Sequence, residues 1–103
     1  MRTDRYFEIG KVDNRLFGSF LEHMGRAVYE GIYQPESDFA DEKGIRTDTS
    51  ALIREMGVST VRYPGGNFVS AYNWEDGVGP REKRPVRLEA AWQNLEDNSF
   101  GTN

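Results

Sequence analysis

The sequence predicts an α/β fold built around a strand–helix–strand unit, and three stretches support this prediction. Leu16 to Leu21 (LFGSFL) is an apolar run too short for a helix, and Gly18 within it suits a strand that another backbone approaches closely. Residues 47–57 carry the start and stop signals of a short helix. Val58 to Tyr63 (VSTVRY) is β-branched and aromatic, and as a strand it must end at Pro64.

The helix between these two runs is well marked at both ends. Thr47 to Ser50 (TDTS) offers side-chain oxygens that can cap its amino end. Leu52, Ile53 and Met56 fall on one helical face, and Gly57 stands where a left-handed residue ends many helices. A strand, a crossover helix and a second strand form a unit whose two strands are parallel.

The remaining segments are expected to be extended or looped. Tyr6 to Val12 (YFEIGKV) alternates loosely and precedes the turn signal Asp13-Asn14, which predicts a short half-buried strand. Residues 22–46 have no sustained period and predict a long ordered loop, and Pro64 to Pro85 predicts a second one. Val86 to Asn98 fits a helix and an extended segment equally well.

Composition excludes several classes of function. The formal net charge is -4, with lysine and arginine scattered, so the basic patch that nucleic-acid binding needs is missing. The chain has no cysteine and one histidine, His23, which excludes a disulfide framework, a thiolate metal site and a histidine cluster. No apolar run is long enough for a signal peptide or membrane span, so we expect a cytoplasmic protein. With 37% hydrophobic residues in 103, we also expect a modest core and a thin stability margin.

Polar residues follow both predicted strands directly. Glu22 comes after the first strand, and the stretch from Arg62 to Asn67 (RYPGGN) lies at the end of the second. Ligands of parallel α/β units bind beyond the carboxyl ends of the strands, so these residues should face the same rim.

Each rim residue has a functional and a purely structural interpretation. Glu22 can accept hydrogen bonds from substrate hydroxyls or be a solvated loop acid. Arg62 is a charge inside an apolar strand, so it contacts either a ligand or a rim acid such as Glu22. Gly65 and Gly66 allow the chain to turn Asn67 inward, where its amide could bind sugar hydroxyls, or Asn67 could simply cap its own turn.

Aromatic residues surround this rim. Tyr72, Trp74 and Trp92 have flat apolar faces that suit sugar rings, although each taken singly is more often a core residue. Beside a Glu, an Arg and an Asn they favour a neutral polyhydroxy ligand. We interpret Glu75 and Asp76 as turn and rim acids rather than an acid–base pair, because adjacent loop residues usually point apart. We interpret His23 as a hydrogen-bonded residue beneath the site, and a direct role as a base is the alternative that stays open.

Four stretches resemble the N-terminal part of bacterial α-L-arabinofuranosidases of glycoside hydrolase family 51. They are FGSFLEHMGRAVYEGIY, FADEKGIRTD, VRYPGGNFVSAYNWEDGVGPREKRP and FGTN, and the resemblance runs from about Tyr6 to Asn103. It implies that residues 15–103 are the N-terminal part of a (β/α)8 TIM barrel, truncated at the start of helix 2, whose cap is Thr102 or Asn103. Residues 1–14 would contribute one strand to a C-terminal β-sandwich domain.

The resemblance also implies a function. Family members are retaining, exo-acting enzymes that release terminal arabinofuranosyl residues from arabinan and arabinoxylan oligosaccharides, without a metal or organic cofactor. Both catalytic glutamates would lie beyond Asn103, so this chain alone is expected to be inactive and poorly stable. Its implied substrate-binding residues are Glu22, Arg62, Asn67 and Trp92.

A cytoplasmic homo-oligomer, a hexamer by resemblance, is expected for the full-length protein, with no nucleic-acid or membrane partner. Two alternatives stay open. One is an endo-glucanase-type glycoside hydrolase of the same family, and the other is a non-catalytic sugar-binding module.

Overall fold

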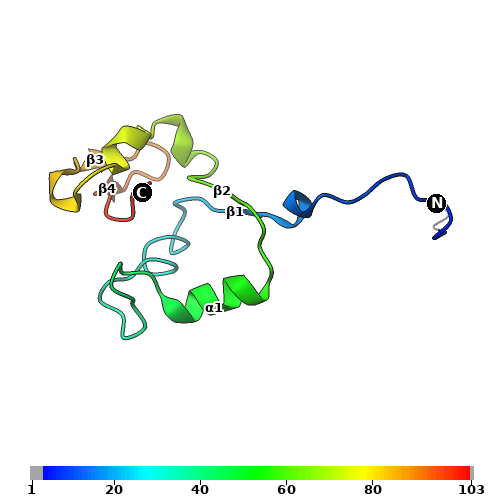
Figure 1. The fold of residues 1–103 in the computed structure, drawn as a ribbon. Helices are drawn as coiled ribbons and strands as arrows, with labels where there is room; N and C mark the ends of the chain where they lie inside the picture. The colour runs from blue at the N-terminus through cyan, green and yellow to red at the C-terminus, as the bar shows by residue number, and fades with distance from the viewer. Residues whose placement is uncertain (1–3, 103) are drawn as a thin grey trace.

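The structure is a computed structural model that describes residues 4–102, and it confirms the strand–helix–strand unit. Strands β1 (Ser19–Phe20) and β2 (Val61–Arg62) are parallel, with Ser19 opposite Val61 and Phe20 opposite Arg62. Helix α1 (Thr47–Glu55) lies between them in sequence and to one side of the strand pair in space (Figure 1). The parallel pairing brings the carboxyl ends of both strands to the same edge.

Both strands are shorter than predicted. The start of the apolar run instead forms a 3₁₀ turn at Asn14–Phe17, because the Asp13 carboxylate accepts a hydrogen bond from the Arg15 amide at 2.9 Å. Gly18 confirms the expected close approach, since a Cβ there would lie 2.8 Å from the Thr60 carbonyl oxygen. Backbone hydrogen bonds continue the pairing beyond the two-residue strands, including one of 2.9 Å from the Leu21 amide to the Arg62 carbonyl oxygen.

Helix α1 ends as predicted but begins differently. Gly57 follows its last turn with a φ of 67°, the left-handed conformation expected there. The N-cap is Arg46, which makes no side-chain capping bond, so the predicted cap among residues 47–50 is wrong. Thr47 is already helical, and its hydroxyl donates to the Phe39 carbonyl at 2.9 Å instead of capping the helix.

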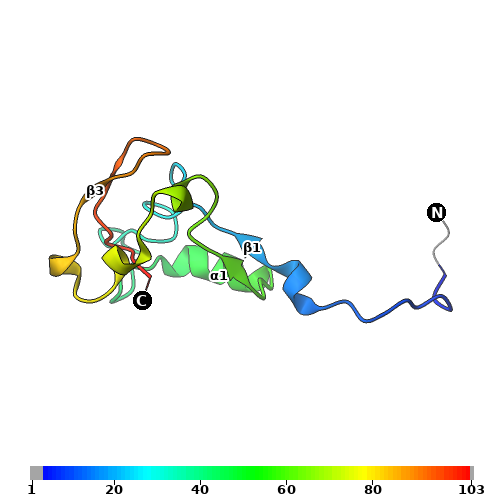
Figure 2. The same ribbon diagram turned by 90° about the horizontal axis from the view of Figure 1, so that it is seen from above.

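The N-terminal segment contradicts the prediction of a half-buried strand at Tyr6 to Val12. Within residues 4–102 this segment pairs with no other strand, and its large apolar side chains are exposed. It extends away from the rest of the molecule (Figure 2). A strand needs a neighbour to satisfy its backbone groups, and the described chain offers none here.

Residues 22–46 and 64–85 contain no α-helix and none of the strands β1 to β4, in line with the two predicted loops, and the second includes 3₁₀ turns at Phe68–Ser70, Trp74–Gly77 and Arg81–Lys83. The segment at residues 86–98 has the extended rather than the helical conformation. β3 (Arg87–Leu88) and β4 (Leu95–Glu96) form an antiparallel hairpin, so the helical alternative is wrong. The final predicted cap falls partly on Asn103, which lies outside the described residues. Thr102 donates its hydroxyl to the Trp74 carbonyl at 3.2 Å.

The core is small and aromatic. Val28, Tyr33 and Phe68 are its buried apolar residues, and the His23 ring stacks on Phe68 with centroids 4.3 Å apart. The Phe100 ring packs edge-on against Tyr33 at 5.7 Å. This layer joins the first loop, the second loop and the C-terminal segment. In the part of the chain that is described, no helix has the length and apolarity needed to cross a membrane.

Candidate functional site

The rim beyond β1 and β2 brings Glu22 against the Pro-Gly-Gly-Asn turn, which confirms the predicted proximity. The Phe68 amide donates to Glu22 Oε1 at 3.0 Å. Gly65 has a φ of 117°, and a Cβ there would collide with the Cα, Cβ and Cγ atoms of Glu22. A Cβ at Gly66 would lie 3.1 Å from Glu22 Oε2. The two glycines therefore let the turn lie directly on the Glu22 side chain.

The half-buried Glu22 carboxylate has free acceptor capacity. Of the two oxygens, only Oε1 accepts a hydrogen bond from the residues that the structure describes. A carboxylate offers about four lone-pair sites. Glu22 can therefore accept further hydrogen bonds from a ligand while the Phe68 amide fixes its orientation.

Arg62 does not pair with Glu22 in the described structure. Its side chain is exposed, and the guanidinium lies over the Phe20 ring, 4.8 Å from the ring centroid. No carboxylate among residues 4–102 lies within ion-pair distance of Arg62, so the ion-pair alternative is wrong here. The stacking on Phe20 leaves the guanidinium donors available at the rim.

Asn67 is also exposed, and it precedes a 3₁₀ turn at Phe68–Ser70. Its side chain makes no capping hydrogen bond to that turn, so the interpretation of Asn67 as a residue that only caps its own turn is not supported. The amide can donate to a ligand and accept from it.

Trp92 lies in the connection between β3 and β4, with 37% of the residue exposed. Its backbone amide donates to Glu89 Oε2 at 2.6 Å, and the Ala91 amide donates to Glu89 Oε1 at 2.5 Å. Across the described chain, no hydrogen bond joins Trp92 to Glu22, Arg62 or Asn67. The structure thus groups Glu22 with the turn that carries Asn67, and holds Trp92 on a separate hairpin.

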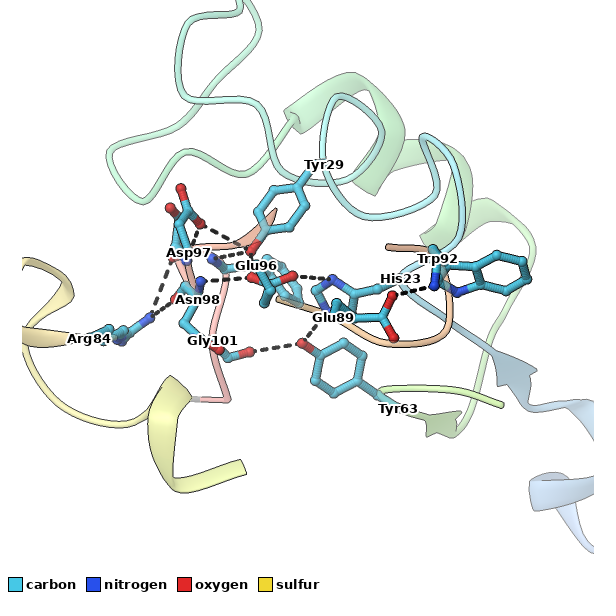
Figure 3. A network of polar contacts seen from close by, with 12 residues as sticks. His23, Tyr29, Tyr63, Arg84, Glu89, Trp92, Glu96, Asp97, Asn98 and Gly101 are labelled. Atoms are coloured by element: carbon cyan, nitrogen blue, oxygen red, sulfur yellow. Dashed lines mark hydrogen bonds and ion pairs between the residues drawn. The ribbon is translucent and has the colours of Figure 1, made fainter. Parts of the chain in front are cut away.

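His23 lies beneath the rim in a buried polar network, as predicted (Figure 3). Its side chain is only 5% exposed, and Nε2 is 2.7 Å from the Tyr63 hydroxyl. Tyr63 in turn donates to the Gly101 carbonyl at 3.1 Å. His23 and Tyr63 thereby connect the ends of β1 and β2 to the C-terminal segment.

Glu96 is the buried acid of this network, and the sequence analysis missed it. Its Oε1 accepts from the Asn98 amide at 2.7 Å and from the Tyr29 hydroxyl, and its Oε2 lies 3.3 Å from His23 Nδ1. Burial, together with the hydrogen bond to Glu96, raises the pKa of Tyr29 far above its usual value. Burial also raises the pKa of Tyr63, with smaller contributions from Tyr72 and Glu96. Both tyrosines therefore stay neutral hydrogen-bonding groups.

The buried acid Glu96 could have been found from the sequence only after the extended state of its segment was known. In an extended segment residues two apart share a face, and Glu96 and Asn98 are both buried. In a helix, residues two apart do not share a face, so the helical alternative would not have paired Glu96 with Asn98.

The loop aromatics and acids have mixed positions. Tyr72 packs on Phe68 with centroids 4.8 Å apart, whereas Trp74 is 61% exposed. The Asp76 carboxylate pairs with Arg87 at 2.9 Å, and this hydrogen bond lowers the pKa of Asp76. Asp76 is therefore a structural acid, in line with its interpretation as a rim residue. Residues 4–102 contain no group of three or more histidines and acids placed to hold a metal ion.

Comparison with known proteins identifies relatives along the whole chain. Residues 52–103 match the model of the α-L-arabinofuranosidase 1 domain. The full chain is 61% identical to intracellular exo-α-(1→5)-L-arabinofuranosidase 1 of Bacillus subtilis. It is also 59% identical, over 96% of its length, to an exo-α-(1→6)-L-arabinofuranosidase of Bifidobacterium longum. The chain spans about a fifth of these curated relatives, 21% and 19% of their respective lengths.

Solved structures agree with this comparison. A family 51 α-L-arabinofuranosidase from Bifidobacterium longum matches with a TM-score of 0.85 and 61% identity, covering 87% of this chain and 18% of that one. A thermostable family 51 α-L-arabinofuranosidase from Thermotoga petrophila matches with a TM-score of 0.82 and 50% identity, covering 85% of this chain and 18% of that one.

Proposed function

Because this chain belongs to the α-L-arabinofuranosidases of glycoside hydrolase family 51, we propose that the protein encoded by its complete gene hydrolyses terminal arabinofuranosyl residues. Its substrates are the non-reducing ends of arabinan and arabinoxylan oligosaccharides. Support comes from several relatives that are named exo-acting α-L-arabinofuranosidases and are more than 50% identical to the chain.

In this proposal the rim binds the arabinofuranose ring. Glu22 accepts hydrogen bonds from ring hydroxyls, Arg62 and Asn67 donate to them, and Trp92 forms a wall toward the leaving group. The observation that carries the assignment is the contact of Glu22 with the Pro-Gly-Gly-Asn turn, which fixes one carboxylate oxygen on the Phe68 amide. The other oxygen and the exposed Arg62 and Asn67 side chains then provide both acceptors and donors for a polyhydroxy ligand.

The chemistry follows the retaining mechanism of glycoside hydrolases. One glutamic acid protonates the glycosidic oxygen, and a second glutamate attacks the anomeric carbon to form a covalent intermediate that water then hydrolyses. We assign both glutamates to the protein beyond Asn103. The residues of this chain bind and orient the sugar, and no cofactor is assigned.

The same proposal gives the fold its larger context. Residues 15–103 are the first part of a (β/α)8 barrel, with β1 and β2 as neighbouring barrel strands and the rim at their carboxyl ends. Residues 1–14 contribute a strand to a β-sandwich domain, a role supported by the exposed, extended segment at Tyr6 to Val12. A cytoplasmic location is supported by relatives named intracellular, and a hexameric assembly belongs to the proposal as well.

The test compares substrates and variants of the complete gene product. We expect hydrolysis of α-1,5-arabino-oligosaccharides and none of cello-oligosaccharides. Arg62→Ala should raise KM about 10- to 100-fold, because a hydrogen bond to a charged group contributes roughly 1.5–3 kcal/mol. Arg54→Ala, which removes an exposed arginine near the end of α1, is the matched control and should leave KM unchanged.

Two outcomes would contradict the proposal. Cleavage of cello-oligosaccharides without cleavage of arabino-oligosaccharides would favour the endo-glucanase alternative. Calorimetric binding of arabino-oligosaccharides without any hydrolysis would favour a sugar-binding module.

A further inference from the structure

The connection between β3 and β4 closes on the side chain of Glu89. The Glu89 amide donates to the Asn94 carbonyl at 2.8 Å, which closes the base of the connection. The carboxylate then turns into the connection, where each oxygen accepts one backbone amide, from Ala91 at 2.5 Å and from Trp92 at 2.6 Å. A single buried acid thus fixes the backbone at Trp92.

The Glu89 carboxylate has no cationic partner in the part of the chain that the structure describes. It is 7% exposed, and the two backbone amides are its only hydrogen-bond donors among residues 4–102. An unpaired buried carboxylate is costly, so the negative charge strongly favours the backbone conformation that presents both amides. Gln93, which follows Trp92, has a φ of 55°. Residues other than glycine adopt this left-handed conformation uncommonly, and here it lies within the tight connection.

Glu89 also faces the layer beneath the rim. Together with His23 and Phe68 it lines a cavity of about 70 Å³. Phe68 is the residue whose amide holds Glu22, and it follows Asn67 directly. Glu89 therefore lies between the two parts of the site, with the rim on one side and Trp92 on the other.

We propose that Glu89 is a positioning residue that sets the place of Trp92 and thereby the affinity for the part of the substrate beyond the arabinofuranosyl ring. The inference rests on the proposed function. Glu89 itself touches neither the sugar nor the reacting bond, and it acts through the backbone of the connection.

The test replaces Glu89 by glutamine in the complete gene product. Glu89→Gln turns one acceptor oxygen into an amide donor, which then faces a backbone N–H, so one of the two hydrogen bonds is lost. We expect KM for α-1,5-arabinotriose to rise about tenfold, a change of about 1.4 kcal/mol in binding. For methyl α-L-arabinofuranoside, whose leaving group is small, KM should change less than about twofold, and kcat should be kept for both.

A second readout follows Trp92 without any sugar. The protein is labelled with 5-fluorotryptophan, and the fluorine NMR signal of Trp92 is identified by its loss in Trp92→Phe. Glu89→Gln should move this signal toward that of free fluorotryptophan. Glu82→Gln, which changes an exposed acid in the same way, is the matched control and should leave the signal and both KM values unchanged.

A rescue variant separates positioning from general destabilisation. Gln93→Gly removes the backbone strain of a side chain at positive φ and so favours the same backbone turn. In the Glu89→Gln background it should therefore lower the raised KM and move the Trp92 signal part of the way back to its wild-type position. If Glu89→Gln protein is not recovered in folded form, Glu89→Asp is measured in its place, since the shorter carboxylate still reaches one amide.

An unchanged Trp92 signal, or equal changes in KM for the two substrates, would overturn the proposal. A wild-type protein that cleaves neither substrate would refute the proposed function instead. In that case the fluorine signal still decides whether Glu89 positions Trp92.

Discussion

Replacing Gly65 with alanine should separate the Pro-Gly-Gly-Asn turn from Glu22 and weaken both stability and substrate binding. The residue has a φ of 117°, which side-chain-bearing residues rarely adopt. An added Cβ would also overlap the backbone and the side-chain stem of Glu22, so rotation of a flexible end group cannot relieve the collision.

The expected cost has two parts. Backbone strain at such a φ contributes about 1–3 kcal/mol. Overpacking against Glu22 adds about 1–3 kcal/mol. We therefore expect the free energy of unfolding to fall by about 2–6 kcal/mol. Displacement of the turn should also break the hydrogen bond from the Phe68 amide to Glu22 and raise KM for arabino-oligosaccharides about tenfold or more.

Gly79→Ala is the matched control for this substitution. Gly79 has a φ of 82°, but an added Cβ there would meet no atom within 4 Å, so only the strain part should appear. Urea unfolding and steady-state kinetics of the complete gene product measure both effects. If Gly65→Ala loses no more stability than Gly79→Ala and keeps its KM, close packing on Glu22 does not fix the rim.

The other predictions concern the buried network and the start of α1. Tyr29→Phe removes a donor from the buried Glu96 carboxylate and should lower the free energy of unfolding by about 1–3 kcal/mol, whereas Tyr6→Phe, at an exposed position, should lower it little. Equal losses in the two variants would contradict the role of the network. Asp48 pairs with Arg46, whose hydrogen bond lowers the pKa of Asp48 from 3.8 to about 2. Its stabilising effect should therefore be complete above pH 3.8 and be lost as the pH falls through about 2, so the Tm gap between wild type and Asp48→Asn should close over that range. A gap at pH 2 as large as the one at pH 5 would refute this, because about half of Asp48 should be protonated in the folded protein at pH 2.

The strand–helix–strand unit could be predicted because its signals are local. An apolar run, a helical face ending at Gly57 and a β-branched run stopped by Pro64 each act within a few residues. The lengths of the strands could not be predicted in the same way. Pairing depends on which backbone groups meet, and the Asp13 side chain, which accepts from the Arg15 amide, favours a 3₁₀ turn before Ser19.

The candidate site was likewise predictable where it depends on the order of the elements and unpredictable where it depends on side-chain packing. Parallel topology was sufficient to predict that Glu22 and the turn before Phe68 lie at one rim. It could not predict that Arg62 stacks on Phe20 rather than pairing with Glu22, because that choice depends on side-chain packing across the strand pair.

By itself, the sequence determined the class of fold, the order of its elements, the family resemblance and the meeting of Glu22 with the glycine turn. Only the tertiary structure decided the conformation of residues 86–98 and the contacts of Glu89, Glu96 and Tyr29. Tyr29 and Glu96 are 67 residues apart, and a hydrogen bond over that separation leaves no local pattern in the chain. Burial of the two acids requires donors for each. Glu89 takes its donors from the connection that follows it, whereas the Tyr29 hydroxyl reaches Glu96 only once the first loop and the hairpin have packed together.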